Sequence, residues 1–265
     1  MKSYYRWVDK HRSLAFILIA TALCTVYTCL LSLLNAHFVV ILLIDALLIF
    51  SVRIHVSDFC KAKLVLYAAK DLTEHCDPDP FKQELENQLA SCKNDQREQL
   101  LRIDLCVALV TMGEYQLVLN TLNGINIDKF PGTLPFQKCI YYNNLADVCT
   151  KTNRFESADA WYQKAAQIYA DLKNKKQRKA IFFTMETARA FDLYRKNEYS
   201  MALDVIQSLK CENLLQKVEN SFFRAQCHIA LNQTDSAREA LCFVIANGNK
   251  TCFVKEAEAL LQQLS

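Results

Sequence analysis

Histidine and cysteine, the residue types that most often act as bases, nucleophiles and metal ligands, are scattered along this sequence. The twelve cysteines include no C-x-x-C pair, and no H-E-x-x-H motif is present. Cys227 and His228 are adjacent, but neighbouring side chains on a helix point about 100° apart, so they form no nucleophile–base pair. A G-x-S-x-G motif and a glycine-rich phosphate loop are also absent from this chain of four glycines. We therefore expect no enzyme, no metal site and no cofactor, and the histidines are isolated: His11, His37, His55, His75 and His228.

A single carboxylate, that of Asp45, interrupts an apolar stretch in which a charge is costly. Four hydroxyl residues in the preceding apolar stretch follow one another at steps of four, three and four and so share one helix face: Thr21, Thr25, Thr28 and Ser32. In a tight hairpin this face can hydrogen-bond Asp45 and lets the two helices pack closely. We interpret the set as a polar clasp within one hairpin or between copies of it. A proton or ion relay and a solvated segment are the alternatives, and a lone acid makes a poor relay.

Two apolar runs near the N-terminus would carry this clasp. Residues 14–34 are uncharged over 21 residues, which is enough to cross roughly 30 Å of hydrocarbon. Residues 37–54 form a second run, interrupted only by Asp45 and Arg53. We predict a transmembrane helical hairpin over 14–55. A single retained span and a cleaved signal peptide are alternatives, and the second run, the length of the first and the lack of a small-residue cleavage site disfavour the latter.

Basic residues set the expected orientation. Residues 1–13 contain four Lys or Arg, the connection between the runs contains none, and further basic residues follow the second run. Because positively charged residues stay on the cytoplasmic side, we predict an integral membrane protein in the lipid bilayer, with both termini in the cytoplasm. Scattered cysteines at apolar positions agree with reduced, buried thiols.

One basic cluster lies far from these runs, and it comprises Lys173, Lys175, Lys176, Arg178 and Lys179. We interpret it as a solvated loop and first helical turn, with contact to anionic lipid headgroups as the alternative. The net charge of +3 is close to neutral, and no aromatic residues interleave the cluster, so we expect no nucleic-acid binding.

Residues 144–168 contain two short helical patterns that meet at a turn over 153–155. Leu145, Ala146 and Cys149 give the first helix an apolar face. The second repeats apolar residues at three- and four-residue steps: Ala158, Tyr162, Ala165 and Ile168. The arrangement resembles a tetratricopeptide repeat, a helix–turn–helix unit of roughly 34 residues, although Ala146 stands where that family has a glycine.

Similar turns recur at 113–115, 197–199 and 232–234, and each follows an apolar-striped helix, over 96–112, 176–196 and 213–231. Ala202 and Ala237 take the position of Ala158. Because such repeats bury a core only by stacking, at least about three copies are expected. We predict an all-α fold with a basic segment over 1–13, the transmembrane hairpin, connector helices over 56–94 and a tetratricopeptide-like α-solenoid of four helix pairs over 95–265.

The resemblance implies binding of a peptide or partner helix in a concave groove lined by the first helices. Laid on this chain, the pattern gives Ile103 and Val107 in the first pair, and a larger set of groove residues in the other three: Asn143, Asp147, Lys151, Thr187, Phe191, Tyr194, Arg195, Phe222 and Gln226. The expected function is a membrane-anchored scaffold or adaptor for a protein partner. A regulatory subunit of a membrane transport or sensory assembly and a regulator that senses a peptide or small ligand are the alternatives. Self-association through a solenoid edge or the hairpin is left open.

Overall fold

A computed structural model of the chain describes residues 5, 12–33, 47, 59–129 and 135–264. The chain divides into two compact units, Met1–Ala68 and Ala69–Ser265. Each unit is described separately below.

The first unit contains the helix α2, which spans Arg12–Leu33 and agrees with the first predicted apolar helix to within two residues at either end. Within α2 the Thr25 hydroxyl donates to the Thr21 carbonyl oxygen at 2.8 Å, a bond inside its own helix. The predicted second run and Asp45 lie outside the described residues, so the clasp stays a prediction. Across the part of the chain that the structure describes, none of the helices combines the length and apolar character required to span a bilayer.

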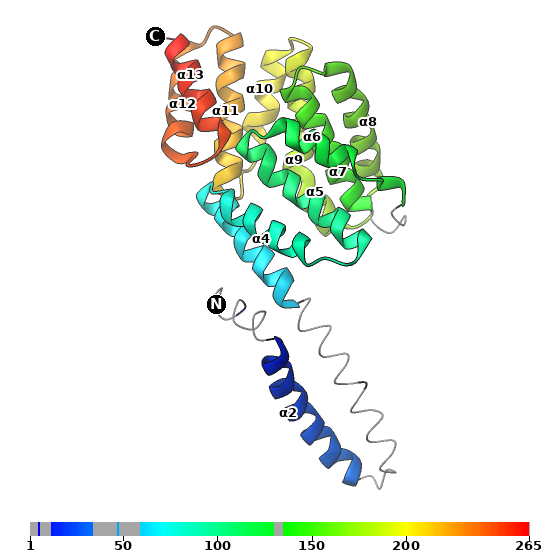
Figure 1. Cartoon of the computed structure of the whole chain (residues 1–265). Coiled ribbons are helices and arrows are strands. Elements are labelled where there is room, and N and C mark those ends of the chain that lie inside the picture. Colours follow the sequence, from blue (N-terminus) through cyan, green and yellow to red (C-terminus); the bar gives the residue numbers. More distant parts are fainter. Residues whose placement is uncertain (1–4, 6–11, 34–46, 48–58, 130–134, 265) are drawn as a thin grey trace. The chain divides into compact units, whose positions relative to one another are not determined.

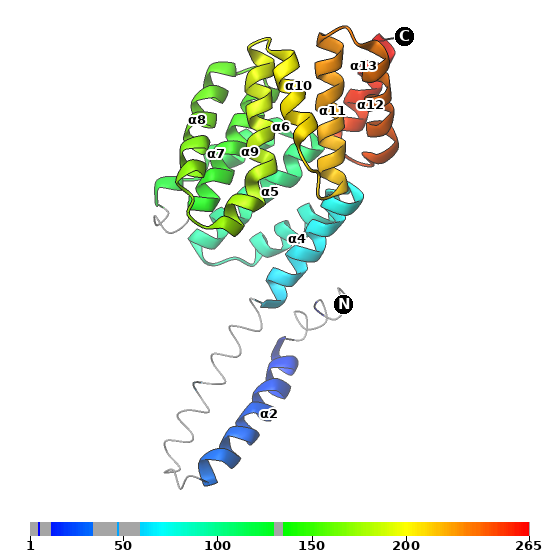
Figure 2. The same ribbon diagram turned by 180° about the vertical axis from the view of Figure 1, so that it is seen from behind.

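The second unit is all-helical. Its first residues, 69–75, are helical, and the further elements are α4 (Asp79–Ala90), α5 (Asp95–Met112), α6 (Tyr115–Asn123), the 3-10 turn η1 (Ile127–Lys129), α7 (Pro135–Lys151), α8 (Phe155–Asp171), α9 (Lys175–Arg195), α10 (Tyr199–Ser208), α11 (Leu214–Ala230), α12 (Thr234–Asn247) and α13 (Cys252–Gln263). Consecutive helices pack side by side as pairs: α5 with α6, α7 with α8, α9 with α10 and α11 with α12 (Figures 1 and 2). This confirms the all-α fold, and the packing in adjacent pairs is consistent with a tetratricopeptide-like solenoid.

The four pairs share one turn, which joins the first helix to the second. Gly113, Asn153, Asn197 and Asn232 each adopt a left-handed backbone, with φ of 80°, 57°, 62° and 57°. The amide after each of them donates to the carbonyl five residues earlier, as Arg154 does to Cys149 at 2.7 Å. This is the Schellman termination of a helix. The repeated turns identified in the sequence therefore have one physical cause, a residue that tolerates positive φ.

The position five residues after each of these left-handed residues is fully buried. It is occupied by Val118, Ala158, Ala202 and Ala237, each 0% exposed. A small side chain here lets the second helix of a pair approach its neighbours closely. The equivalence inferred from Ala202 and Ala237 extends to Val118, which the sequence comparison did not identify.

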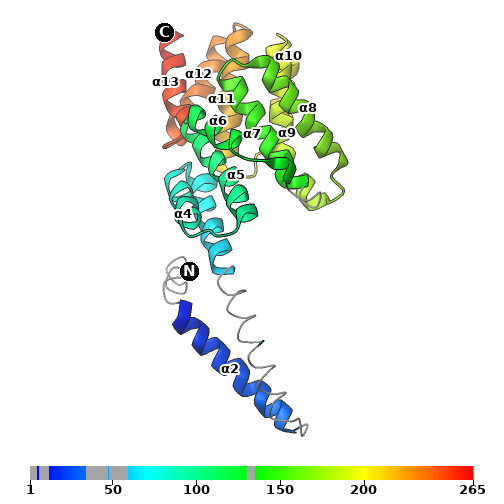
Figure 3. The ribbon, with the colours of Figure 1, turned by 45° about the vertical axis from the view of Figure 1, so that its right-hand side comes forward.

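Two features differ from the expected pattern. A further helix, α13, follows the fourth pair and packs on α11 and α12 (Figure 3). Its inner face, with Phe253 and Ala257, completes a core cluster around Phe222 and Leu241. α13 thus covers an apolar face that the last pair would leave open, which is the role of a terminal helix in a stacked array.

The second difference concerns α4, which was predicted as part of the connector. This helix begins at Asp79. The Asp77 carboxylate accepts a hydrogen bond from the Asp79 amide at 3.2 Å. α4 then packs along α5, so this part of the predicted connector extends the helical array.

Candidate functional site

The first helices of the pairs surround a cavity of about 330 Å³ in the second unit. Its wall comes mainly from α5, α7, α9 and α11, and α6, α8, α13 and Thr73 complete it. The cavity lies on the side where the resemblance placed a concave groove. Its volume is at the lower end of the range for ligand pockets, which suits a small molecule or an inserted side chain.

Contacts between the two ends of the helical array close this cavity. The Tyr115 hydroxyl of α6 donates to the Glu256 carboxylate of α13 at 3.2 Å. A Cβ on Gly113 would lie 3.0 Å from the Cβ of Cys252, a tight approach, and the φ of 80° at Gly113 further favours glycine beside α13. Lys250, which precedes α13, pairs with Asp77 and Asp79 at 2.9 Å each. The two ends of the helical array therefore contact each other beside the inner surface, a feature that the sequence analysis did not predict.

Several of the predicted groove residues do line the cavity, and these are Val107, Asn143, Asp147, Lys151, Thr187, Phe191 and Arg195. Others do not. Ile103 and Phe222 are each 1% exposed and belong to the core. Tyr194 packs its ring against Tyr199 and Phe223. Gln226 is partly buried and is not part of the wall.

Helix α7 presents a polar stripe to the cavity, with Asn143, Asp147 and Lys151 at four-residue steps. The Lys151 ammonium lies over three aromatic rings, 5.3 Å from the ring centre of Phe191, 5.7 Å from that of Phe222 and 5.5 Å from that of Phe253. These distances are within the range of cation–π attraction. One cation on α7 is thus held by rings from α9, α11 and α13.

Two carboxylates of the wall sit deep in the protein. Asp147 on α7 and Glu219 on α11 are partly exposed, and both line the cavity. Burial raises the pKa of Asp147, with Lys151 opposing that rise. Burial, together with the Asp147 charge, raises the pKa of Glu219 to about 7. Loss of water around the charged form is the dominant cause at both residues.

Two buried polar atoms of the wall have no hydrogen-bond partner among the described residues. They are Oδ1 of Asn143, a residue 7% exposed, and Oγ1 of Thr187, a residue 4% exposed. An unpartnered buried polar atom costs about 1–3 kcal/mol. Such atoms are the usual sign of a position that a ligand or an ordered water completes.

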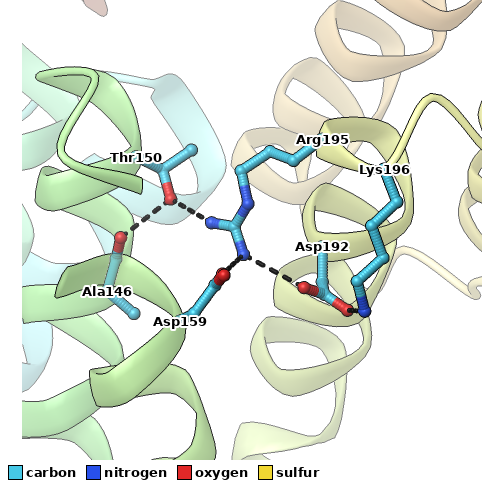
Figure 4. A network of polar contacts seen from close by, with 6 residues as sticks. All are labelled: Ala146, Thr150, Asp159, Asp192, Arg195 and Lys196. Carbon is cyan, nitrogen blue, oxygen red and sulfur yellow. Dashed lines mark hydrogen bonds and ion pairs between the residues drawn. The ribbon is translucent and has the colours of Figure 1, made fainter. Parts of the chain in front are cut away.

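The Arg195 guanidinium, at the edge of the cavity, is already engaged in a network that joins neighbouring pairs (Figure 4). It donates to Thr150 of α7 at 2.9 Å, to Asp192 of its own helix at 3.1 Å and to Asp159 of α8. Lys196 completes the network with an ion pair to Asp192 at 2.7 Å. This arrangement favours a structural role for Arg195 over the predicted role in ligand binding.

Glu219 and Phe253 are wall residues that sequence reasoning missed. Glu219 lies one helical turn before Phe222, the residue that the family pattern selected, so the pattern placed the inner face of α11 too far along by three residues. The available signal was a charged side chain between the buried residues Val218 and Asn220. Phe253 could not be found in this way, because it comes from α13, which lies outside the four pairs.

The thiols nearest to this region are poor nucleophiles. Burial raises the pKa of Cys106, Cys139 and Cys227 to about 12, so these thiols stay protonated. His228 is 5% exposed, and its Nδ1 lies 2.6 Å from Oε1 of Gln233 at the following turn. Within the described residues no group of three or more His, Cys, Asp or Glu is arranged to hold a metal ion.

A tetratricopeptide repeat model matches residues 140–172, which cover most of α7 and all of α8. No curated protein and no solved structure gives a significant match to the chain. The matched repeat contains the polar stripe of α7. A repeat of this kind suggests a role in protein–protein interaction and implies a protein partner.

Proposed function

We propose that this chain is an interaction module that binds a segment of a partner protein through the cavity wall. The observation that carries the proposal is the cavity between the first helices, whose wall includes Asn143 and Thr187, two residues with buried polar atoms that lack a partner among the described residues. Because the ends of the array meet around it, the segment inserts a side chain or a chain end and does not lie along an open groove. The chain acts as a scaffold or adaptor, without chemistry of its own.

A cavity-filling variant tests this function. Ala188 of α9 lines the cavity, so Ala188→Phe occupies space that a partner needs. Ala246 of α12 is exposed and lies outside the cavity wall, so Ala246→Phe adds the same side chain without filling it. Proteins captured by the parent chain would be identified and then retested as purified proteins.

We expect a partner that binds the parent and Ala246→Phe but binds Ala188→Phe at least about tenfold more weakly, with the variant folded by circular dichroism. A partner that binds all three chains equally would exclude the cavity as its site. The volume added by phenylalanine in a packed interior is the reason to check folding first.

A second candidate function is the sensing of a small molecule, and the closure of the cavity by α13 favours it. A ligand that binds only the folded state raises the melting temperature with its concentration. Saturable stabilisation by a metabolite, lost in Ala188→Phe, would support this function in place of the protein partner.

We also propose, from the sequence, that residues 14–54 attach the chain to a membrane with both termini in the cytoplasm. The 21 uncharged residues from Leu14 to Leu34 support the proposal. Alkaline carbonate extraction of membranes, followed by protease protection of tags at the two ends, tests it. Release into the supernatant, or cleavage of either tag by protease added outside sealed cells, would contradict it.

A further inference from the structure

The cavity wall contains acceptors that lack a partner among the described residues. In this wall, the carboxylates of Asp147 and Glu219 accept no hydrogen bond and form no ion pair among the described residues. Oδ1 of Asn143 is a third acceptor without a partner, and the Thr187 hydroxyl has neither a donor nor an acceptor. A ligand that satisfies this wall must bring donors.

The charges of the cavity wall also favour a ligand that carries a positive charge. Lys151 is the cation that stands near both Asp147 and Glu219, and a single ammonium cannot neutralise two carboxylates. Arg195 does not supply the balance, because its guanidinium pairs with Asp159 and Asp192. With both carboxylates ionised, the wall therefore keeps an excess of negative charge in a desolvated place, which is unfavourable until a positive charge enters.

The rest of the wall is apolar. Ile140, Phe183, Met185 and Phe253 contribute to it, and the Phe191 ring already faces one ammonium group. Such a surface accommodates a hydrocarbon stem that ends in a cation, and aromatic rings add attraction for the cation itself.

We infer that this cavity binds an ammonium or guanidinium group on an apolar stem, supplied by a lysine or arginine side chain of the partner. The cationic group donates to Asp147 and Glu219, and the stem lies against the aromatic wall. The inference rests on the proposed function, since it names the chemistry of the inserted segment. A free alkyl amine offers the same chemistry, so the test separates the two sources.

Isothermal titration calorimetry of the whole chain tests the inference with four probes: pentylammonium, its neutral isostere pentanol, the peptide acetyl-Gly-Lys-Gly-amide and the same peptide acetylated on the lysine side chain. We expect both cationic probes to bind at least about tenfold more tightly than their neutral counterparts. Binding of pentylammonium without the peptide would overturn the partner side chain as its source. Equal binding of charged and neutral probes, or no binding of any, would overturn the cation site.

Glu219→Gln is the diagnostic variant, because it keeps the shape of the side chain and removes its charge. We expect about a tenfold or greater loss of affinity for pentylammonium, and no change in Glu239→Gln, whose carboxylate is exposed on α12. Unchanged affinity in Glu219→Gln would contradict the inference. Removal of a buried charge does not threaten folding, so the variant stays informative.

The pH dependence gives a second measurement. Glu219 faces Asp147 and Lys151, and its pKa of about 7 means that it binds protons in the neutral range. A bound cation favours the ionised form, so binding at pH 7 releases protons and the affinity falls as the pH drops from 8 to 6. Affinity independent of pH over this range would contradict a role for Glu219.

Failure of these probes would leave the proposed function standing wherever a purified partner still distinguishes Ala188→Phe from Ala246→Phe. If the partner binds Ala188→Phe and Ala246→Phe equally while pentylammonium still binds, the partner-binding function is contradicted and the cation site is supported. The two results are therefore separable.

Discussion

At the scale of single residues, the wall of this cavity contains buried polar and charged groups that destabilise the folded state. Asn143 and Thr187 bury polar atoms without partners, and Asp147 and Glu219 hold carboxylates in a desolvated wall. Each weakens the folded state by itself, since buried polar atoms normally find partners. These four residues share the wall of one cavity, which is the reason to assign function there.

Glu219 makes this cost measurable. Its pKa in the folded chain, about 7, lies above the ordinary value of 4.5. The folded state therefore binds the proton more tightly than the unfolded state, and stability falls as the pH rises from about 4.5 through 7. We expect Glu219→Gln to be more stable than the parent at pH 8, by at most about 3 kcal/mol, and nearly equal at pH 5. Urea unfolding at both values checks this, and Glu239→Gln serves as control. A variant that is less stable at pH 8 would show that the carboxylate is well paired.

At the scale of elements, the turns of the repeats were the part most readable from the sequence. The turns over 113–115, 153–155, 197–199 and 232–234 predicted where the helices end, because a left-handed residue stops a helix for a local reason. Three of the first helices, predicted over 96–112, 176–196 and 213–231, likewise have small errors at their ends. The first helix of the second pair was predicted less well, because the pattern began at residue 144 whereas α7 begins at Pro135. Local signals of this kind do not depend on the rest of the fold.

Asn232 offers the cleanest test of these turns. It has φ of 57° and no side-chain bond of its own among the described contacts. We expect Asn232→Ala to lower the free energy of unfolding by about 1 kcal/mol, because alanine adopts the left-handed region less readily than asparagine does. Asn232→Gly should match or slightly exceed the parent. The two variants would be compared by urea unfolding, and equal loss in both would mean that the asparagine side chain carries the effect.

The contacts between pairs were much less predictable. Arg195 was expected in the groove, yet its guanidinium joins α9 to α7 and α8, with 14% of its side chain exposed. We expect Arg195→Ala to cost about 1–3 kcal/mol, because it removes hydrogen bonds to charged and hydroxyl groups in a half-buried network. Arg189→Ala, which loses an exposed pair with Glu186 on its own helix, should cost less than about 0.5 kcal/mol. Similar losses of stability in both variants would show that the contacts of Arg195 with α7 and α8 contribute little to the free energy of unfolding.

At the scale of the whole second unit, the closure of the array decides what kind of ligand fits. The sequence pattern gave an open groove because each repeat is read separately, whereas the closure depends on contacts between residues about 140 positions apart, such as Tyr115 and Glu256. Sequence spacing carries no signal for such a contact. For the same reason Phe253 was missed and Phe222 was taken for a groove residue.

The closure also predicts how this unit unfolds. An open solenoid can lose its repeats one after another, but here α13 ties the last pair to α5 and α6. We expect that ending the chain after residue 248 exposes the cluster around Phe222 and Leu241 and replaces a single unfolding transition by a broader one. Urea unfolding followed by Trp161 fluorescence and by circular dichroism would compare the two chains. Coincident, equally steep transitions in both would contradict the structural role given to α13.

The most direct measurement for the central claim is the affinity of a purified partner for the parent chain, Ala188→Phe and Ala246→Phe under one set of conditions. The cavity as binding site predicts that Ala188→Phe loses about tenfold or more in affinity, while Ala246→Phe binds like the parent. A folded Ala188→Phe chain that binds its partner as tightly as the parent would show that the partner is recognised elsewhere on the molecule.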